Sequence, residues 1–83
     1  MRTIDTGVLT IKVPIFTDLT SKPFKALIAA LVGLSIHFDI ALEVAVGESI
    51  SPIAISGDIE LERAEEIKQR ALVHVRDWKA GTE

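Results

Sequence analysis

The sequence has no cysteine, and aromatic residues amount to only 5% of the chain. The lack of cysteine excludes disulfides, thiol catalysis and metal sites held by thiolates. It suits a reducing compartment, so we expect a cytoplasmic protein. The shortage of aromatic side chains means that the core has to be built from aliphatic residues.

Three further features are missing. The sequence has no glycine-rich loop of the kind that binds phosphates, so no nucleotide is expected. The net charge of -3 provides no general basic surface for the phosphates of a nucleic acid. The longest apolar run, residues 26–34, is about half of the roughly 20 residues that cross a bilayer, and the N-terminus has no apolar signal segment. We therefore expect no contact with a membrane.

What remains is the size and composition of one folded domain, residues 1–83. Hydrophobic residues make up 48% and charged residues 25%, which is typical of a globular protein rather than a disordered one. A chain of this length is near the size at which a single core stabilises the fold by only a few kcal/mol. Packing against a second copy would therefore matter, and a homo-oligomer is expected.

The clearest periodic signal lies in residues 35–46, where large apolar residues occupy every even position. A repeat of two is typical of a strand that has one face in the core. The pattern predicts one long strand. Its other face would carry the smaller or polar residues Ser35, His37, Asp39, Ala41, Glu43 and Ala45.

Two shorter strands are expected, one before and one after the long strand. Residues 8–16 alternate in the same way. Because proline cannot donate to a ladder, Pro14 places the end of this strand at a sheet edge or where the missing donor would point to solvent. Residues 50–55 follow a turn at Gly47 and are expected to form a hairpin with the long strand. Pro52 indicates that this strand lies near an edge or pairs only after residue 52.

A helix is expected between the first strand and the long strand. It begins near Lys22, with Thr20 or Ser21 as the capping residue, and ends at Gly33. Residues 24–32 contain a single charged side chain. Such a helix has almost no hydrophilic side, so it has to be surrounded by protein.

The last part of the chain predicts a long amphipathic helix that starts near Asp58 and stops at Gly81. Its acidic residues come first and its basic residues last, as the helix dipole favours. An alternative takes Gly57 and Asp58 as a hairpin turn, because apolar residues also alternate across them. We favour the helix because its apolar residues recur at three and four over a longer stretch: Leu61, Ala64, Ile67, Ala71, Leu72, Val75 and Trp78.

These elements give the order β-α-β-β-α without a repeat, a linker or a low-complexity tract. We predict a two-layer α+β domain with a three-stranded, mainly antiparallel sheet. It contains one long strand and a long C-terminal amphipathic helix.

Ser35, His37 and Asp39 are the residue types of a hydrolytic triad. Neighbours on one face of a strand are about 6.6–6.8 Å apart at the backbone, whereas the chemistry needs side-chain contacts of about 2.6–3.2 Å. We therefore predict no catalytic residue and no enzyme. The sequence also lacks the spaced ligands of zinc and calcium sites, so no metal and no cofactor are expected.

The favoured function is a small protein-interaction module, a homodimer that binds a protein partner and inhibits or regulates it. Inhibitors, immunity-type proteins and phage-encoded regulators of this size act in that way. An all-round apolar helix and a strand face interrupted by alanines both favour protein contact. Two alternatives stay open: an enzyme or ligand-binding subunit with a site shared between protomers around His37, Asp39 and Glu43, and a weak nucleic-acid binder.

The hypothesis assigns a surface to each kind of contact. The dimer interface is predicted on the apolar helix, at Leu27, Ile28, Leu31, Val32 and Leu34. The protein partner is predicted to be positively charged and to meet the acidic start of the last helix and the polar strand face. The residues expected to bind it are Glu60, Glu62, Glu65, Glu66, His37, Asp39 and Glu43.

Overall fold

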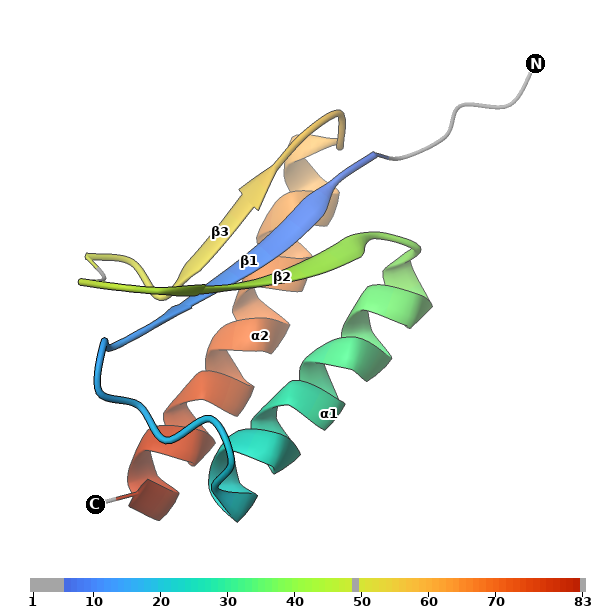
Figure 1. The fold of residues 1–83 in the computed structure, drawn as a ribbon. Helices are drawn as coiled ribbons and strands as arrows, with labels where there is room; N and C mark the ends of the chain where they lie inside the picture. Colours follow the sequence, from blue (N-terminus) through green and yellow to red (C-terminus); the bar gives the residue numbers. More distant parts are fainter. Residues whose placement is uncertain (1–5, 49, 83) are drawn as a thin grey trace.

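The computed structural model describes residues 6–48 and 50–82. Its elements follow the predicted order β-α-β-β-α, and the α+β class is confirmed (Figure 1). They are β1 (Val8–Val13), α1 (Lys22–Phe38), β2 (Ala41–Val46), β3 (Ile53–Ser56) and α2 (Leu61–Thr82).

The three strands form a mixed sheet in the order β2-β1-β3. β1 pairs parallel with β2, from Val8 opposite Ala41 to Val13 opposite Val46, and antiparallel with β3. The sheet is therefore not mainly antiparallel, and β2 and β3 do not form the predicted hairpin. β1 is the central strand, so the sheet edge expected at Pro14 is not formed. Pro14 is compatible with a central strand because it lies one residue beyond β1, where its missing N–H removes no hydrogen bond from the ladder.

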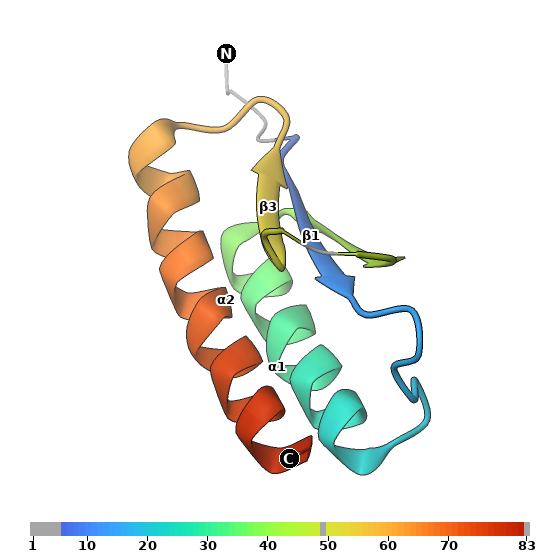
Figure 2. The same cartoon turned by 90° about the vertical axis from the view of Figure 1, so that its left-hand side faces the viewer.

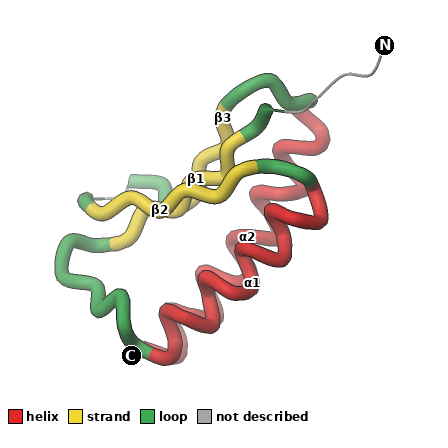
Figure 3. Tube along the Cα trace, turned by 45° about the vertical axis from the view of Figure 1, so that its right-hand side comes forward, coloured by secondary structure: helices red, strands yellow, loops and turns green. Residues whose placement is uncertain are grey.

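Both helices cover the same face of the sheet, and they run side by side in opposite directions (Figures 1 and 2). α2 has 22 residues and is about 33 Å long, whereas the six residues of β1 span about 20 Å. The helices therefore extend past the sheet at the end where α1 begins and α2 ends. The connection between β1 and α1 spans this end (Figure 3).

The predicted long strand is wrong in its first part, because residues 35–38 belong to α1. The helix does not end at Gly33 but at Asp39, which takes the left-handed conformation at φ 55°. The Asp39 N–H donates to the Ile36 carbonyl at 3.2 Å, and the Ile40 N–H donates to the Ser35 carbonyl at 2.9 Å. These two bonds close the helix end in the way that a residue after the last turn commonly does.

The start of α1 agrees with the prediction. Ser21 is the capping residue, and its hydroxyl oxygen accepts a hydrogen bond from the Phe24 N–H at 3.3 Å. Pro23 lies in the first turn, where a missing N–H costs no helical hydrogen bond. The sequence therefore located the beginning of this helix correctly and its end too early.

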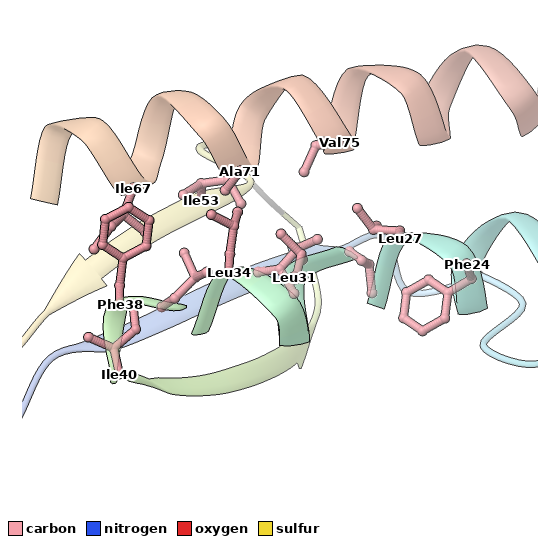
Figure 4. Close-up of a cluster of buried hydrophobic side chains, with 13 residues drawn as sticks. Phe24, Leu27, Leu31, Leu34, Phe38, Ile40, Ile53, Ile67, Ala71 and Val75 are labelled. Atoms are coloured by element: carbon pink, nitrogen blue, oxygen red, sulfur yellow. The ribbon is translucent and has the colours of Figure 1, made fainter. Parts of the chain in front are cut away.

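The core lies between the sheet and the two helices and is mainly aliphatic. β1 contributes Leu9, Ile11 and Val13, all completely buried, which are the alternate residues that the sequence placed on one face. In Figure 4, side chains of α1, β3 and α2 point toward one another in this layer. The remaining buried apolar residues are Phe24, Leu27, Leu31, Leu34, Phe38, Ile40, Ile53, Ile67, Ala71 and Val75.

The C-terminal helix is confirmed, and the alternative hairpin turn at Gly57 is not formed. The helix continues past Gly81 instead of stopping there. It is tied to the end of α1 by Arg63, whose guanidinium donates to the Phe38 carbonyl. Arg63 and Arg70 also lie 5.9 and 5.5 Å from the centre of the Phe38 ring. The cations thus meet both the carbonyl end of the helix dipole and an aromatic face.

Candidate functional site

Ser35, His37 and Asp39 do not form a catalytic arrangement. Ser35 is buried in α1, where its hydroxyl donates to the Val32 carbonyl at 2.8 Å. His37 is exposed on the same helix and packs edge-on against Phe38, while Asp39 closes the helix end. Residues two apart on a helix are about 200° apart around its axis, so the serine and the histidine point in different directions.

The predicted shared site around His37 also lacks a common surface. Glu43 lies on β2 and is exposed on the sheet face away from the helices, where its carboxylate accepts from the Thr10 hydroxyl at 3.4 Å. His37 and Asp39 lie at the end of α1 instead of on that strand. The polar strand face expected from the alternation therefore exists only from Ala41 onward.

The acidic residues predicted to bind a partner are where the sequence placed them. Glu60, Glu62, Glu65 and Glu66 are all exposed at the start of α2. Arg63 lies among them but is engaged with Phe38. The role of this acidic surface stays a prediction.

The predicted dimer interface is largely inside the domain. Leu27, Leu31 and Leu34 are buried, and Ile28 is partly buried against the same core. Of this set Val32 is the exposed member, with 39% of its surface accessible. The apolar helix is thus covered by its own sheet and by α2, and these leucines are not available to a second copy.

A different surface stands out at the end where the helices extend past the sheet. Residues 14–16, residues 47, 48, 50 and 52, and the last turns of α2 meet there around a cleft of about 380 Å³. The described residues that line it are Lys12, Pro14, Ile15, Phe16, Gly47, Glu48, Ile50, Pro52, Trp78 and Lys79. Apolar side chains predominate, and charges of both signs lie among them.

A second cleft of about 640 Å³ adjoins the first. Pro14, Phe16, Trp78 and Lys79 line both clefts, so these residues stand between them. Phe16 is 97% exposed and Ile50 is 105% exposed, although both are large apolar residues. We call the surface formed by Ile15, Phe16, Ile50 and Trp78 the loop-end patch.

The backbone that carries Phe16 is held at both ends. Pro14 ends β1, and the Thr17 N–H donates to the Pro14 carbonyl at 3.1 Å. Farther on, the hydroxyl and the N–H of Thr20 donate to the Asp18 carboxylate at 2.7 and 2.9 Å. Both hydrogen bonds hold the pKa of Asp18 below its ordinary value, and the bond from the hydroxyl has the larger effect. The charge of Lys25 lowers this pKa further.

Trp78 forms the floor of the patch. Its ring packs edge-on against Phe24 with the centroids 6.0 Å apart. Its indole N–H is buried and has no hydrogen-bond partner among the described residues. Because a buried donor without an acceptor costs about 1–3 kcal/mol, an acceptor brought close to this group would stabilise the domain.

The sequence carried a partial signal for this surface. Phe16 falls on the same side of the alternation as Lys12 and Pro14, which is the polar side of the first strand. An aromatic residue on a polar face is a candidate contact residue. Ile50 and Trp78 gave no such signal, because one lies in a turn and the other belongs to the apolar stripe of the last helix.

Neither a metal site nor a membrane-spanning helix is found in the described part of the chain. Within residues 6–48 and 50–82, no group of three or more His, Asp or Glu side chains is arranged to hold a metal ion. None of the helices in those ranges combines the length and the apolar character needed to cross a membrane. Comparison with protein-family models, with curated proteins and with solved structures found no match.

Proposed function

We propose that the chain is a small protein-interaction module that inhibits or regulates a protein partner by occupying its surface through the loop-end patch. The observation that carries the proposal is the full exposure of Phe16 and Ile50 on the rim of one cleft. Burying a side chain of this size stabilises a contact by about 1.5–3 kcal/mol. Two such side chains beside a cleft have the character of anchors that a partner would cover.

The geometry also favours this patch over the acidic surface as the main contact. The acidic residues lie at the first turns of α2 and Trp78 lies near its end, about 25 Å away along the helix axis. The four glutamates of the acidic surface line neither of the two clefts, and charge on a rim changes association rates more than affinity. A contribution from Glu62 and Glu66 to steering a basic partner remains part of the proposal.

The test is affinity capture from the native host with the wild-type chain and with the double variant Phe16→Ser, Ile50→Ser. A partner that binds the loop-end patch should be recovered with the wild type and reduced at least tenfold with the variant. Because both side chains are already in solvent, the free energy of unfolding should change by less than about 0.5 kcal/mol. A thermal melt of each protein checks that both are folded.

Leu61→Ser is the matched control. Leu61 is 77% exposed and apolar but lies at the opposite end of α2. Capture with this control should equal that of the wild type. Recovery of the same proteins with the double variant would contradict the proposal.

A second candidate function is the binding of a small ligand, in line with the ligand-binding subunit considered from the sequence. The specific observation for it is the pair of clefts, whose volumes of about 380 and 640 Å³ fall within the usual range of ligand sites, about 300–1,000 Å³. Trp78 is the only tryptophan and lines both clefts as well as a smaller hollow between α1 and α2, so its fluorescence reports on these three places. A spectral shift on adding the small-molecule fraction of the host, lost in Phe16→Ser, would favour this candidate over a protein partner.

Two broader expectations belong to the same proposal. We place the protein in the cytoplasm, which the lack of cysteine supports. We assign it no catalytic role, because the residue types of the sequence triad are dispersed over α1 and its end. Any hydrolytic activity that was lost in Ser35→Ala would contradict this assignment.

A further inference from the structure

β2 is an edge strand whose outer backbone groups have no partner strand in the three-stranded sheet. The Ala41 N–H donates to the Gly7 carbonyl at 3.1 Å, and the Gly47 N–H donates to the Val13 carbonyl at 2.9 Å. Backbone groups alternate in direction along a strand, so the odd positions of β2 point to β1. The N–H and C=O groups of the even positions, Leu42, Val44 and Val46, therefore point away from the sheet.

This edge lacks the features that usually prevent pairing. Between residues 41 and 46 there is no proline, no lysine and no arginine, and Glu43 is the single charged residue. The other edge differs, because β3 has four residues and Pro52 directly precedes it. The free edge of β2 is thus the longer and the more open of the two.

Exposed apolar side chains accompany the edge. The register with β1 puts Val44 and Val46 on the face that carries the helices, yet they are 40% and 52% exposed. On α1, Val32 and Ile36 are 39% and 75% exposed. This side of α1 faces away from α2, since Ala30, on the opposite side, shares a hollow with residues of α2. In Figure 1, β2 begins beside the end of α1 and then crosses in front of β1, away from that helix.

The edge is complementary to itself. Antiparallel pairing about a two-fold axis at Val44 would place Val44 opposite Val44 of a second copy and Leu42 opposite Val46. All three positions have outward backbone groups, so each opposed pair would exchange two hydrogen bonds, about six in total. Glu43 would lie opposite Ala45, and the two Glu43 residues would be diagonal neighbours about 7–8 Å apart instead of directly opposite each other.

We propose that β2 binds a second copy of this chain in this register, joining two sheets into one of six strands with the α1 helices on the same side. The contact is a strand edge about 20 Å long backed by one helix flank. A contact made of one strand edge and one helix flank is at the small end of specific interfaces, so we expect a weak, reversible dimer with a dissociation constant on the order of micromolar. This surface is separate from the loop-end patch, and the dimer does not depend on the proposed function.

The first test uses the absence of cysteine from the chain. In Val44→Cys, the two introduced residues of the dimer would have Cα atoms about 5.5 Å apart, which is within the range of a disulfide. Mild oxidation at a protein concentration of about 100 µM should convert most of this variant to a cross-linked dimer. Ala45→Cys alone should not cross-link, whereas a mixture of Ala45→Cys with Glu43→Cys should.

Val73→Cys is the matched control, because Val73 is 45% exposed on α2. Its oxidation rate measures random collision, and Val44→Cys should react at least tenfold faster. Equal rates would overturn the proposal. Faster cross-linking of Ala45→Cys than of Val44→Cys would overturn the register.

The second test measures the molecular mass in solution. Sedimentation equilibrium of the wild type should show a shift from 9.0 kDa toward twice that mass as the concentration rises through the micromolar range. Val44→Lys should stay at 9.0 kDa while melting close to the wild type, because the substituted side chain is partly in solvent. A wild type that remains monomeric up to about 1 mM would contradict the dimer.

Discussion

Leu31→Ala should lower the free energy of unfolding by about 3–5 kcal/mol. Leu31 is completely buried between the sheet and α2, in contact with the core rather than with solvent. Removing a buried leucine side chain costs the transfer free energy of the lost atoms and leaves a cavity. In a domain of this length the loss would be a large fraction of the total stability, and it is measured by urea denaturation.

The neighbouring substitution Val32→Ala is the control. Val32 is on the exposed side of α1, so its truncation should cost less than about 1 kcal/mol. The difference between the two variants distinguishes a core position of Leu31 from the dimer interface predicted from the sequence, in which both residues would contact a second copy. If Leu31 were in an interface, the cost of Leu31→Ala would depend on protein concentration, and such a dependence would contradict its place in the core.

Gly57→Ala should cost about 2–4 kcal/mol. Gly57 follows β3 with φ at +98°, a conformation that residues with a Cβ rarely adopt. A Cβ at this position would lie 2.6 Å from the Thr6 carbonyl oxygen and 3.1 Å from the Gly7 Cα. Because both neighbours are backbone atoms at the start of β1, relief would require the two strands to separate.

Gly47→Ala isolates the conformational part of that cost. Gly47 also has a positive φ, +154°, but apart from its two chain neighbours no heavy atom of the described residues lies within 4 Å of an added Cβ. Its substitution should cost about 1 kcal/mol, so the difference between the two variants measures the contact with the β1 backbone. Equal losses in thermal denaturation would mean that the close approach at Gly57 does not exist.

The sequence predicted the first strand and the last helix better than the segment between them. The alternation at Leu9, Ile11 and Val13 and the three-and-four spacing at Ile67, Ala71 and Val75 each favour one type of element, and both predictions are confirmed. Their periods are distinct because each run is long enough to show which residues share a face.

Residues 35–38 show why the middle failed. Ile36 and Phe38 fit the alternation of the following strand, but Phe38 also lies four residues after Leu34 on the buried side of α1. A short apolar run satisfies both periods, and only packing against α2 decides between them. The sequence also did not predict that β1 is central. Pro14 suggested an edge, but it lies just after the last residue of the strand, where it affects no hydrogen bond of the ladder.

The candidate surfaces depend on relations that no local pattern contains. Phe16 is exposed because β1 ends three residues earlier and the chain turns there, so its alternation no longer applies. The exposure of Val44 follows from where α1 stops covering β2. The exposure of both residues depends on how the helices lie on the sheet. The sequence therefore predicted an excess of apolar surface but not its location.

In the structure, one helix runs through Gly33 to Phe38 and is buried by its own domain. The melting temperature of Gly33→Ala is the most direct test of this continuity. Gly33 is exposed inside α1, and apart from its chain neighbours and the backbone of its own helix no heavy atom of the described residues lies within 4 Å of an added Cβ. Alanine is better than glycine in a helix interior by about 0.8–1 kcal/mol, so the variant should melt several degrees higher. A lower melting temperature would contradict the account, since it is the result expected if Gly33 ended the helix in a left-handed conformation and residues 35–46 formed one strand.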